Sequence, residues 1–159
     1  MSVRVFPTVK VLHSPLLPDV TAKDKGTYIH RALQEIRTLD DATSAIHSLY
    51  LRGIINPEII CEEEMQQIVS QLLANPKVQP WFVPTLTILN EQAITDDKGK
   101  LQRIDRLVIT PEGRAIVIDY KTGHYHKDYR TQVKDYMEAL HQIGYPEVEG
   151  YLLFIKDGK

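Results

Sequence analysis

Two different spacings of apolar residues divide the chain into an N-terminal and a C-terminal part. In the N-terminal part the apolar residues recur every three or four positions, which is typical of helices that bury one face. This pattern predicts helices over residues 26–38, 41–52 and 57–74. Proline at the start of the third range suits the first turn of a helix. We therefore expect residues 1–83 to be mainly helical.

From residue 85 onward, short apolar runs are separated by turn residues, as in a sheet. The pattern predicts, in order, strand 85–94, strand 101–109, strand 114–120, helix 128–143 and strand 148–155. The third strand is almost uninterruptedly apolar, which places it in the middle of the sheet. A helical crossover then returns the last strand parallel to the third. The chain is thus predicted to be one α/β domain over residues 1–159, in which residues 84–159 form a mixed central sheet flanked by helices.

Composition narrows the class of protein. The 159 residues are 43% hydrophobic and 25% charged, which is ordinary for a soluble globular domain with one core. The apolar runs are too short to span a bilayer, and the N-terminus lacks a signal-peptide pattern. Cys61 is the only cysteine, which excludes a disulfide framework and a four-cysteine iron–sulfur cluster. We expect a cytoplasmic protein without membrane contact and without an iron–sulfur cluster.

The hairpin between the second and third predicted strands brings two aspartates together. Its turn residues Pro111 and Gly113 fit a three-residue loop with glycine in the left-handed conformation. Counting back from this loop places Asp105 opposite Asp119, and strand alternation places Asp105 on the face of Leu107. Opposed carboxylates lie about 5 Å apart at Cβ and repel each other. A divalent cation such as Mg²⁺, which prefers carboxylates, water and phosphate, would remove this repulsion.

Lys121 follows Asp119 by two residues, so its side chain points to the same face of the strand. A metal, a positioned water and a nearby cation are the components that phosphodiester hydrolysis requires. The competing interpretation is structural: Asp105 pairs with Arg103 or Arg106, and Asp119 with Lys121, as ion pairs at strand ends. Spacing alone does not decide between these interpretations.

Further motifs add to these two strands. Gly26-Thr27-Tyr28-Ile29-His30 lies on the first helix, Ile104-Asp105-Arg106-Leu107 and Ile118-Asp119-Tyr120-Lys121-Thr122-Gly123 lie on the two strands, and Gln132 precedes Tyr136 by four residues. In this order, the motifs resemble the RecB-type branch of the PD-(D/E)XK nuclease superfamily, found at the C-terminal end of bacterial helicase–nucleases. The resemblance extends from residue 26 to about 154 and implies a restriction-endonuclease-like core.

The resemblance also implies a role for each matched residue. It implies four metal ligands: His30, Asp105, Asp119 and the backbone carbonyl of Tyr120. Lys121 would be the catalytic lysine, acting together with Asp105 and Asp119. Three further residues would shape the site or bind substrate: Gln132, Tyr136 and Glu91, the last of which matches a glutamate common on the first strand of this branch.

By this resemblance we expect a Mg²⁺- or Mn²⁺-dependent deoxyribonuclease of recombination and repair, with exonuclease action favoured over endonuclease action. By the same resemblance its partners would be DNA and a helicase in the same parent polypeptide or complex. The chain has no phosphate-binding loop, so it contains no recognisable ATP motor. Two alternatives stay open. One is a catalytically silent domain that binds DNA or braces a helicase, and the other is a metal-dependent phosphoesterase for small molecules. The basic and aromatic run 124–130 favours a polyanion, and the net charge of −2 indicates that such contact is local.

Overall fold

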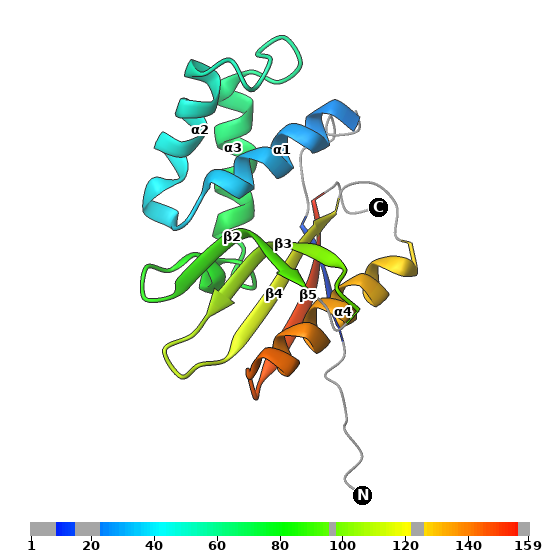
Figure 1. Ribbon diagram of the computed structural model, residues 1–159. Coiled ribbons are helices and arrows are strands. Elements are labelled where there is room, and N and C mark those ends of the chain that lie inside the picture. Colours follow the sequence, from blue (N-terminus) through cyan, green and yellow to red (C-terminus); the bar gives the residue numbers. More distant parts are fainter. Residues whose placement is uncertain (1–8, 15–22, 96–97, 122–125, 156–159) are drawn as a thin grey trace, which may run out of the picture.

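In the computed structural model, helices flank a five-stranded sheet with the strand order β1-β5-β4-β3-β2 (Figure 1). The structure describes residues 9–14, 23–95, 98–121 and 126–155, so that part of the predicted 96–99 turn and of the 124–130 run lies outside it. The elements are β1 (Lys10–Ser14), α1 (Lys23–Glu35), η1 (Leu39–Asp41), α2 (Ala42–Leu51), α3 (Glu62–Ala74), η2 (Gln79–Phe82), β2 (Thr87–Thr95), β3 (Leu101–Ile109), β4 (Ala115–Lys121), α4 (Asp128–Ile143) and β5 (Val148–Ile155). In the described ranges, no helix has the length and apolar character needed to cross a bilayer.

The β3–β4 hairpin has the predicted register. Thr110 N–H donates to the carbonyl of Arg114 at 2.9 Å, and Gly113 has a φ of 88°, as the predicted three-residue loop requires. The two strands pair in antiparallel fashion up to Arg106 and Ile118. The chain then crosses over through α4, and β5 runs parallel to β4. The prediction of an α/β fold with a mixed sheet flanked by helices is therefore confirmed.

Each face of the sheet is covered by an apolar cluster of its own. One cluster joins α1, α2 and α3 to the sheet and includes Ile29, Leu33 and Ile118. The other lies between the sheet and α4 and includes Val117 and Val133. Figure 1 shows α1, α2 and α3 grouped together and apart from α4. The central strand β4 is buried on both faces, which explains its nearly continuous apolar sequence.

The third helix begins later than the sequence pattern predicts, at Glu62 and not at Pro57. The intervening residues form a turn around Asn56, whose side-chain oxygen and carbonyl accept backbone N–H groups that follow it in the chain. Ile60, with 1% of its surface exposed, anchors this turn in the core. The prediction was wrong because the asparagine turn outcompetes helix formation here. The three glutamates 62–64 then occupy the first helical turn, where the helix dipole favours negative charge.

The strand β1 was not predicted from the apolar pattern. It is five residues long and pairs in parallel with β5, from Lys10 opposite Tyr151 to Ser14 opposite Ile155. A parallel partner so distant in sequence leaves no local turn signal, so that only the tertiary pairing identifies this strand. As a consequence β5 lies inside the sheet and not at its edge.

A buried arginine joins the helices to the sheet. Arg106 of β3 has none of its surface exposed, and its guanidinium donates to the carbonyls of Ile36 at 2.8 Å, Arg37 at 2.6 Å and Trp81 at 2.7 Å. The first two carbonyls directly follow α1, so Arg106 anchors the end of this helix to the sheet. Because α1 also carries His30, the anchor helps to set the distance between helix and strand at that residue.

Candidate active site

Three carboxylates lie in one row across β2, β3 and β4. The β2–β3 register places Glu91 opposite Asp105, and the β3–β4 register places Asp105 opposite Asp119. Neither of these two pairs belongs to the regular backbone ladder, which is interrupted on both sides of Asp105. In place of a ladder bond, Asp105 Oδ2 accepts the N–H of Tyr120 at 2.9 Å. The strands therefore open at the point where the acidic side chains meet.

The backbone is distorted at the same point. Glu91 has a φ of 54°, the one positive φ among the described non-glycine residues, and this conformation is unfavourable for a glutamate. On β3, Ile104 and Leu107 both pack in the cluster beneath α4, although residues three apart on a regular strand face opposite sides. Simple alternation, which placed Asp105 on the face of Leu107, thus does not describe β3 at Asp105.

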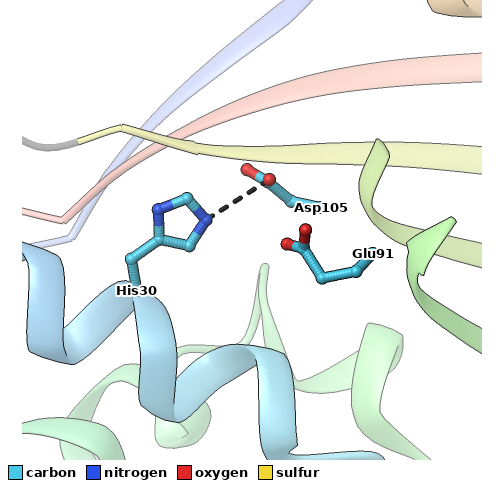
Figure 2. Close-up of side chains that lie close together, drawn as sticks. All are labelled: His30, Glu91 and Asp105. Atoms are coloured by element: carbon cyan, nitrogen blue, oxygen red, sulfur yellow. Dashed lines mark ion pairs between the residues drawn. The ribbon is translucent and has the colours of Figure 1, made fainter. Parts of the chain in front are cut away.

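His30 of α1 points toward two of the carboxylates (Figure 2). Its Nε2 lies 3.3 Å from Asp105 Oδ1. One side-chain atom from each of His30, Glu91 and Asp105 lies within 4.8 Å of the others, which is a spacing that suits a single metal ion. One imidazole nitrogen and two carboxylates from α1, β2 and β3 therefore face a common point.

Asp119 lies beside this group, on the other side of Asp105. It is not one of the three residues grouped above, but its carboxyl is within hydrogen-bonding reach of that of Asp105. The Asp119 side chain is only 4% exposed, and Lys121 Nζ lies 3.0 Å from its Oδ2. The hairpin thus brings the two predicted aspartates and the lysine together in a nearly dry environment.

Structural ion pairs account for only part of this arrangement. The pair between Asp119 and Lys121 is present. Among the residues placed in the structure, however, Asp105 makes no ion pair with Arg103 or Arg106. Arg106 donates to backbone carbonyls, and Arg103 approaches a different carboxylate. The purely structural interpretation therefore explains one aspartate and not the other.

The two polar residues of α4 extend the site from Lys121. Lys121 Nζ donates to Gln132 Oε1 at 3.1 Å, and Gln132 Nε2 donates to the hydroxyl of Tyr136 at 2.8 Å. This chain of hydrogen bonds holds the ammonium group in place. Tyr120 contributes through its N–H, which donates to Asp105. Metal ligation by the Tyr120 carbonyl stays a prediction.

The two aspartates have opposite pKa shifts. Burial, followed by the charge of Asp105, raises the pKa of Asp119 to about 7, although Lys121 opposes the rise. Burial also acts to raise the pKa of Asp105, but the hydrogen bond and charge of His30 and the N–H of Tyr120 lower it below its ordinary value of 3.8. One proton is therefore held at the pair up to neutral pH, and Asp119 carries most of it.

The remaining two groups respond to the same negative charge. Burial lowers the pKa of His30, but the hydrogen bond to Asp105 and the charges of Asp105, Glu91 and Asp119 outweigh it, so that the pKa lies above 6.5. Burial and the charge of Asp105 raise the pKa of Glu91. His30, Glu91 and Asp119 therefore bind protons more tightly than they would in water, as expected for a cluster that lacks a cation, whereas Asp105 binds its proton less tightly.

Unpaired buried atoms test whether a metal fits this site. Within the described ranges, Glu91 Oε1 is buried without a partner, whereas His30 Nε2 and Asp119 Oδ2 are buried with one ion-pair contact each, to Asp105 and to Lys121. A buried polar atom that is left unsatisfied costs about 1–3 kcal/mol. A divalent cation with its water ligands would satisfy these atoms. The carboxylates suit Mg²⁺ or Mn²⁺, and the imidazole adds a nitrogen ligand of the kind that transition-metal ions accept. The residues fit a divalent metal ion.

The metal-free protein is expected to be less stable at pH 8 than at pH 5. The pKa of Asp119 is about 7 in the folded state against 3.8 in the unfolded chain, so the folded state binds more protons across this window. Stability therefore falls as the pH rises through it, and the raised pKa of His30 acts in the same direction. Urea denaturation in the presence of EDTA measures the effect. Asp119→Asn, which cannot titrate, should flatten the profile, whereas stability that increases from pH 5 to pH 8 would contradict the shift.

Glu91 was expected to bind substrate or shape the site, and its place beside His30 and Asp105 was not predicted. The missing signal was the length of the β2–β3 loop. Once Thr95 is known to pair with Leu101, counting back places Glu91 opposite Asp105. The turn residues 96–99 do not fix that length from sequence, because several hairpin loops accept them.

Two comparisons with known proteins found similarities to this chain. A family model described as the PD-(D/E)XK nuclease superfamily matches residues 9–158. The chain is also similar to an ATP-dependent helicase/nuclease subunit from Staphylococcus aureus strains JH9, JH1 and USA300. Each of these relatives is 25% identical over 169 residues, a stretch that covers 86% of this chain and 14% of the relative. The chain therefore matches about one seventh of the length of these relatives.

Proposed function

The chain belongs to the PD-(D/E)XK nuclease superfamily, and from this we propose that it is a metal-dependent nuclease that hydrolyses phosphodiester bonds of DNA. The observation that carries the proposal is the meeting of His30, Glu91 and Asp105 at ligand distance, with Asp119 and Lys121 beside them. Buried acidic groups that repel one another and are incompletely hydrogen-bonded destabilise the folded protein. A bound cation would offset this cost.

We propose five metal-binding groups, of which at most a few contact one ion at a time: His30, Asp105, Asp119, the backbone carbonyl of Tyr120, and Glu91. Glu91 joins the ligands suggested by family resemblance because its carboxylate lies within 4.8 Å of the ligand atoms of His30 and Asp105. A Mg²⁺ or Mn²⁺ ion held there would lower the pKa of a coordinated water and offset charge on the phosphate. The raised pKa values of His30 and Asp119 favour proton release when the ion binds.

Lys121 is proposed as the catalytic residue next to the metal centre. Its Nζ is 3.0 Å from Asp119 Oδ2 and is held by Gln132, so it is fixed near the metal without binding it. From this position the ammonium group orients the attacking water and offsets charge that develops on the phosphate. Tyr136 supports this arrangement by accepting a hydrogen bond from Gln132.

Replacing Lys121 by alanine is expected to slow DNA cleavage about 100-fold or more, because the lost interaction is concentrated in the transition state. Metal affinity and DNA affinity should change little. Lys121→Arg should restore part of the rate, since it keeps the charge but not the compact point donor. Single-turnover cleavage of single- and double-stranded DNA at saturating Mg²⁺ or Mn²⁺ measures the effect, with EDTA as the blank. An unchanged rate in Lys121→Ala would remove this residue from the mechanism.

The cellular context is also a proposal. The relatives are named as helicase/nuclease subunits and are much longer than the matched region, so we propose that this nuclease works with a helicase in one polypeptide or complex during DNA recombination and repair. It would act in the cytoplasm and as an exonuclease.

Comparing linear with circular DNA substrates tests exonuclease action, because a circle offers no end. A wild-type protein that binds DNA but cuts none with either metal would favour the catalytically silent alternative.

A further inference from the structure

A hollow of about 640 Å³ lies between the start of β3 and the first turns of α4. Arg103 and Tyr129 are among its lining residues, as are Gln132 and Tyr136. The last two belong to the hydrogen-bonded chain that holds Lys121, so the hollow opens directly beside the candidate metal centre. A DNA strand whose scissile phosphate lies at the metal centre must continue along the neighbouring surface, and this hollow is the adjoining space.

The two walls of the hollow carry opposite charge. Lys100 and Arg103 lie on the β3 wall, whereas Asp128 and Asp135 lie on the α4 wall. A phosphate group in the hollow is attracted to the first wall and repelled by the second. The backbone of a bound strand is therefore expected to lie along the start of β3.

Arg103 is a residue of that wall that also contacts a proposed metal ligand. Its side chain is 65% exposed, and its Nη1 lies 3.7 Å from Glu91 Oε2. An exposed ion pair of this kind contributes at most about 1 kcal/mol, so the guanidinium is held beside the site without being fixed there. When Glu91 binds a cation, its charge is shared, and Arg103 becomes available to another anion.

We propose that Arg103 binds the phosphate next to the scissile one, and that the β3 wall of the hollow guides the DNA strand to the metal centre. The proposal rests on the proposed nuclease function. Arginine suits the task because its planar fork donates two parallel hydrogen bonds to a phosphate. Glu91 thereby couples metal binding to DNA binding. Without a metal ion it pairs with Arg103, and with a metal ion bound it leaves Arg103 available to the DNA strand. Arg103 is thus a substrate-positioning residue, not a metal ligand.

The test is the salt dependence of DNA binding by Arg103→Ala. Fluorescence anisotropy of a labelled single-stranded oligonucleotide, with Ca²⁺ as the metal, gives the dissociation constant over a range of KCl concentrations. Loss of one phosphate contact should weaken binding and reduce the slope of log K against log[salt] by about 0.7. Arg103→Gln should give the same decrease, and Arg103→Lys should keep the slope because it keeps the charge.

Arg52→Ala is the matched control. Arg52 is also an exposed arginine paired with a glutamate, at 3.5 Å from Glu35, but it does not line the hollow. The Arg52→Ala variant loses the same charge and should keep the wild-type slope of log K against log[salt]. An unchanged slope in Arg103→Ala, or an equal decrease in Arg52→Ala, would overturn the proposal.

Binding of Mn²⁺ to the DNA-free protein gives an independent readout. Removing the arginine frees Glu91, so Arg103→Ala should bind Mn²⁺ more tightly, by no more than about fivefold, the equivalent of an exposed ion pair. Weaker Mn²⁺ binding would show that Arg103 supports the metal centre and would overturn the proposed role. Neither measurement depends on cleavage, so a wild-type protein that fails to cut DNA overturns the proposed function alone.

Discussion

Replacing Asp119 by alanine is expected to abolish metal-dependent DNA cleavage while the metal-free protein stays folded and at least as stable as the wild type at neutral pH. Asp119 is 4% exposed and lies against Asp105, and burial together with this neighbour raises its pKa to about 7. Removing it relieves the repulsion between the two carboxyls. The same change deletes a proposed metal ligand and the partner of Lys121, so catalysis loses both the ion and the orientation of the lysine.

Two measurements separate these effects. Single-turnover cleavage with Mn²⁺ should fall to the EDTA blank, and urea denaturation in EDTA should show no loss of stability. Asp40→Ala is the control, because Asp40 is an exposed aspartate outside the site and its loss should change neither. Wild-type cleavage by Asp119→Ala would remove Asp119 from the metal centre. Marked destabilisation of the metal-free variant would instead show that Asp119 serves mainly as a structural partner of Lys121.

Local rules predicted the parts of the fold and site that depend on neighbouring residues. The Pro111–Gly113 turn fixed the β3–β4 register, because its loop length and its left-handed glycine admit few alternatives. That register brought Asp105 opposite Asp119, and strand spacing placed Lys121 next to Asp119. Helix α4 and strands β3 and β5 matched the predicted bounds for the same reason, since each has a strong periodic pattern between clear turns.

Other parts depend on contacts between distant segments, and no local pattern contains them. The edge strand β1 exists through its pairing with β5. The position of Glu91 depends on the length of the β2–β3 loop and on a left-handed backbone conformation, neither of which can be predicted from the local sequence. His30 was singled out by family resemblance, because a single histidine beside an apolar stripe gives no sign of the carboxylate that it faces. The competing interpretation paired Asp105 with a β3 arginine, but Arg106 is buried and donates to backbone carbonyls.

The largest loss of stability is expected from replacing Arg106 by alanine. Its guanidinium stacks on Phe82, with Cζ 3.7 Å from the ring centre, and donates to carbonyls that follow α1 and to the carbonyl of Trp81. Among the described residues it makes no ion pair, and besides these carbonyls it donates to the side-chain oxygen of Asn90 at 3.3 Å. Truncation leaves the carbonyls buried without donors and opens a cavity beside Phe82. At about 1–3 kcal/mol for each buried carbonyl that loses its donor, the three carbonyls together predict a loss of at least about 3 kcal/mol.

In a domain of this size, such a loss lowers the melting temperature by roughly 10 °C. Arg106→Lys should recover only part of it, because one ammonium group cannot reach carbonyls on two segments as the planar guanidinium does. Arg103 lies on the same strand but is exposed, so Arg103→Ala should lower the free energy of unfolding by less than about 1 kcal/mol. Because the helix that Arg106 anchors also carries His30, Arg106→Ala should bind Mn²⁺ more weakly under conditions where it is folded. Excess Mn²⁺ should raise its melting temperature by mass action. Thermal denaturation with and without Mn²⁺ measures both effects. A loss of less than about 1 kcal/mol would mean that other donors satisfy the carbonyls and that α1 is held in place without this arginine.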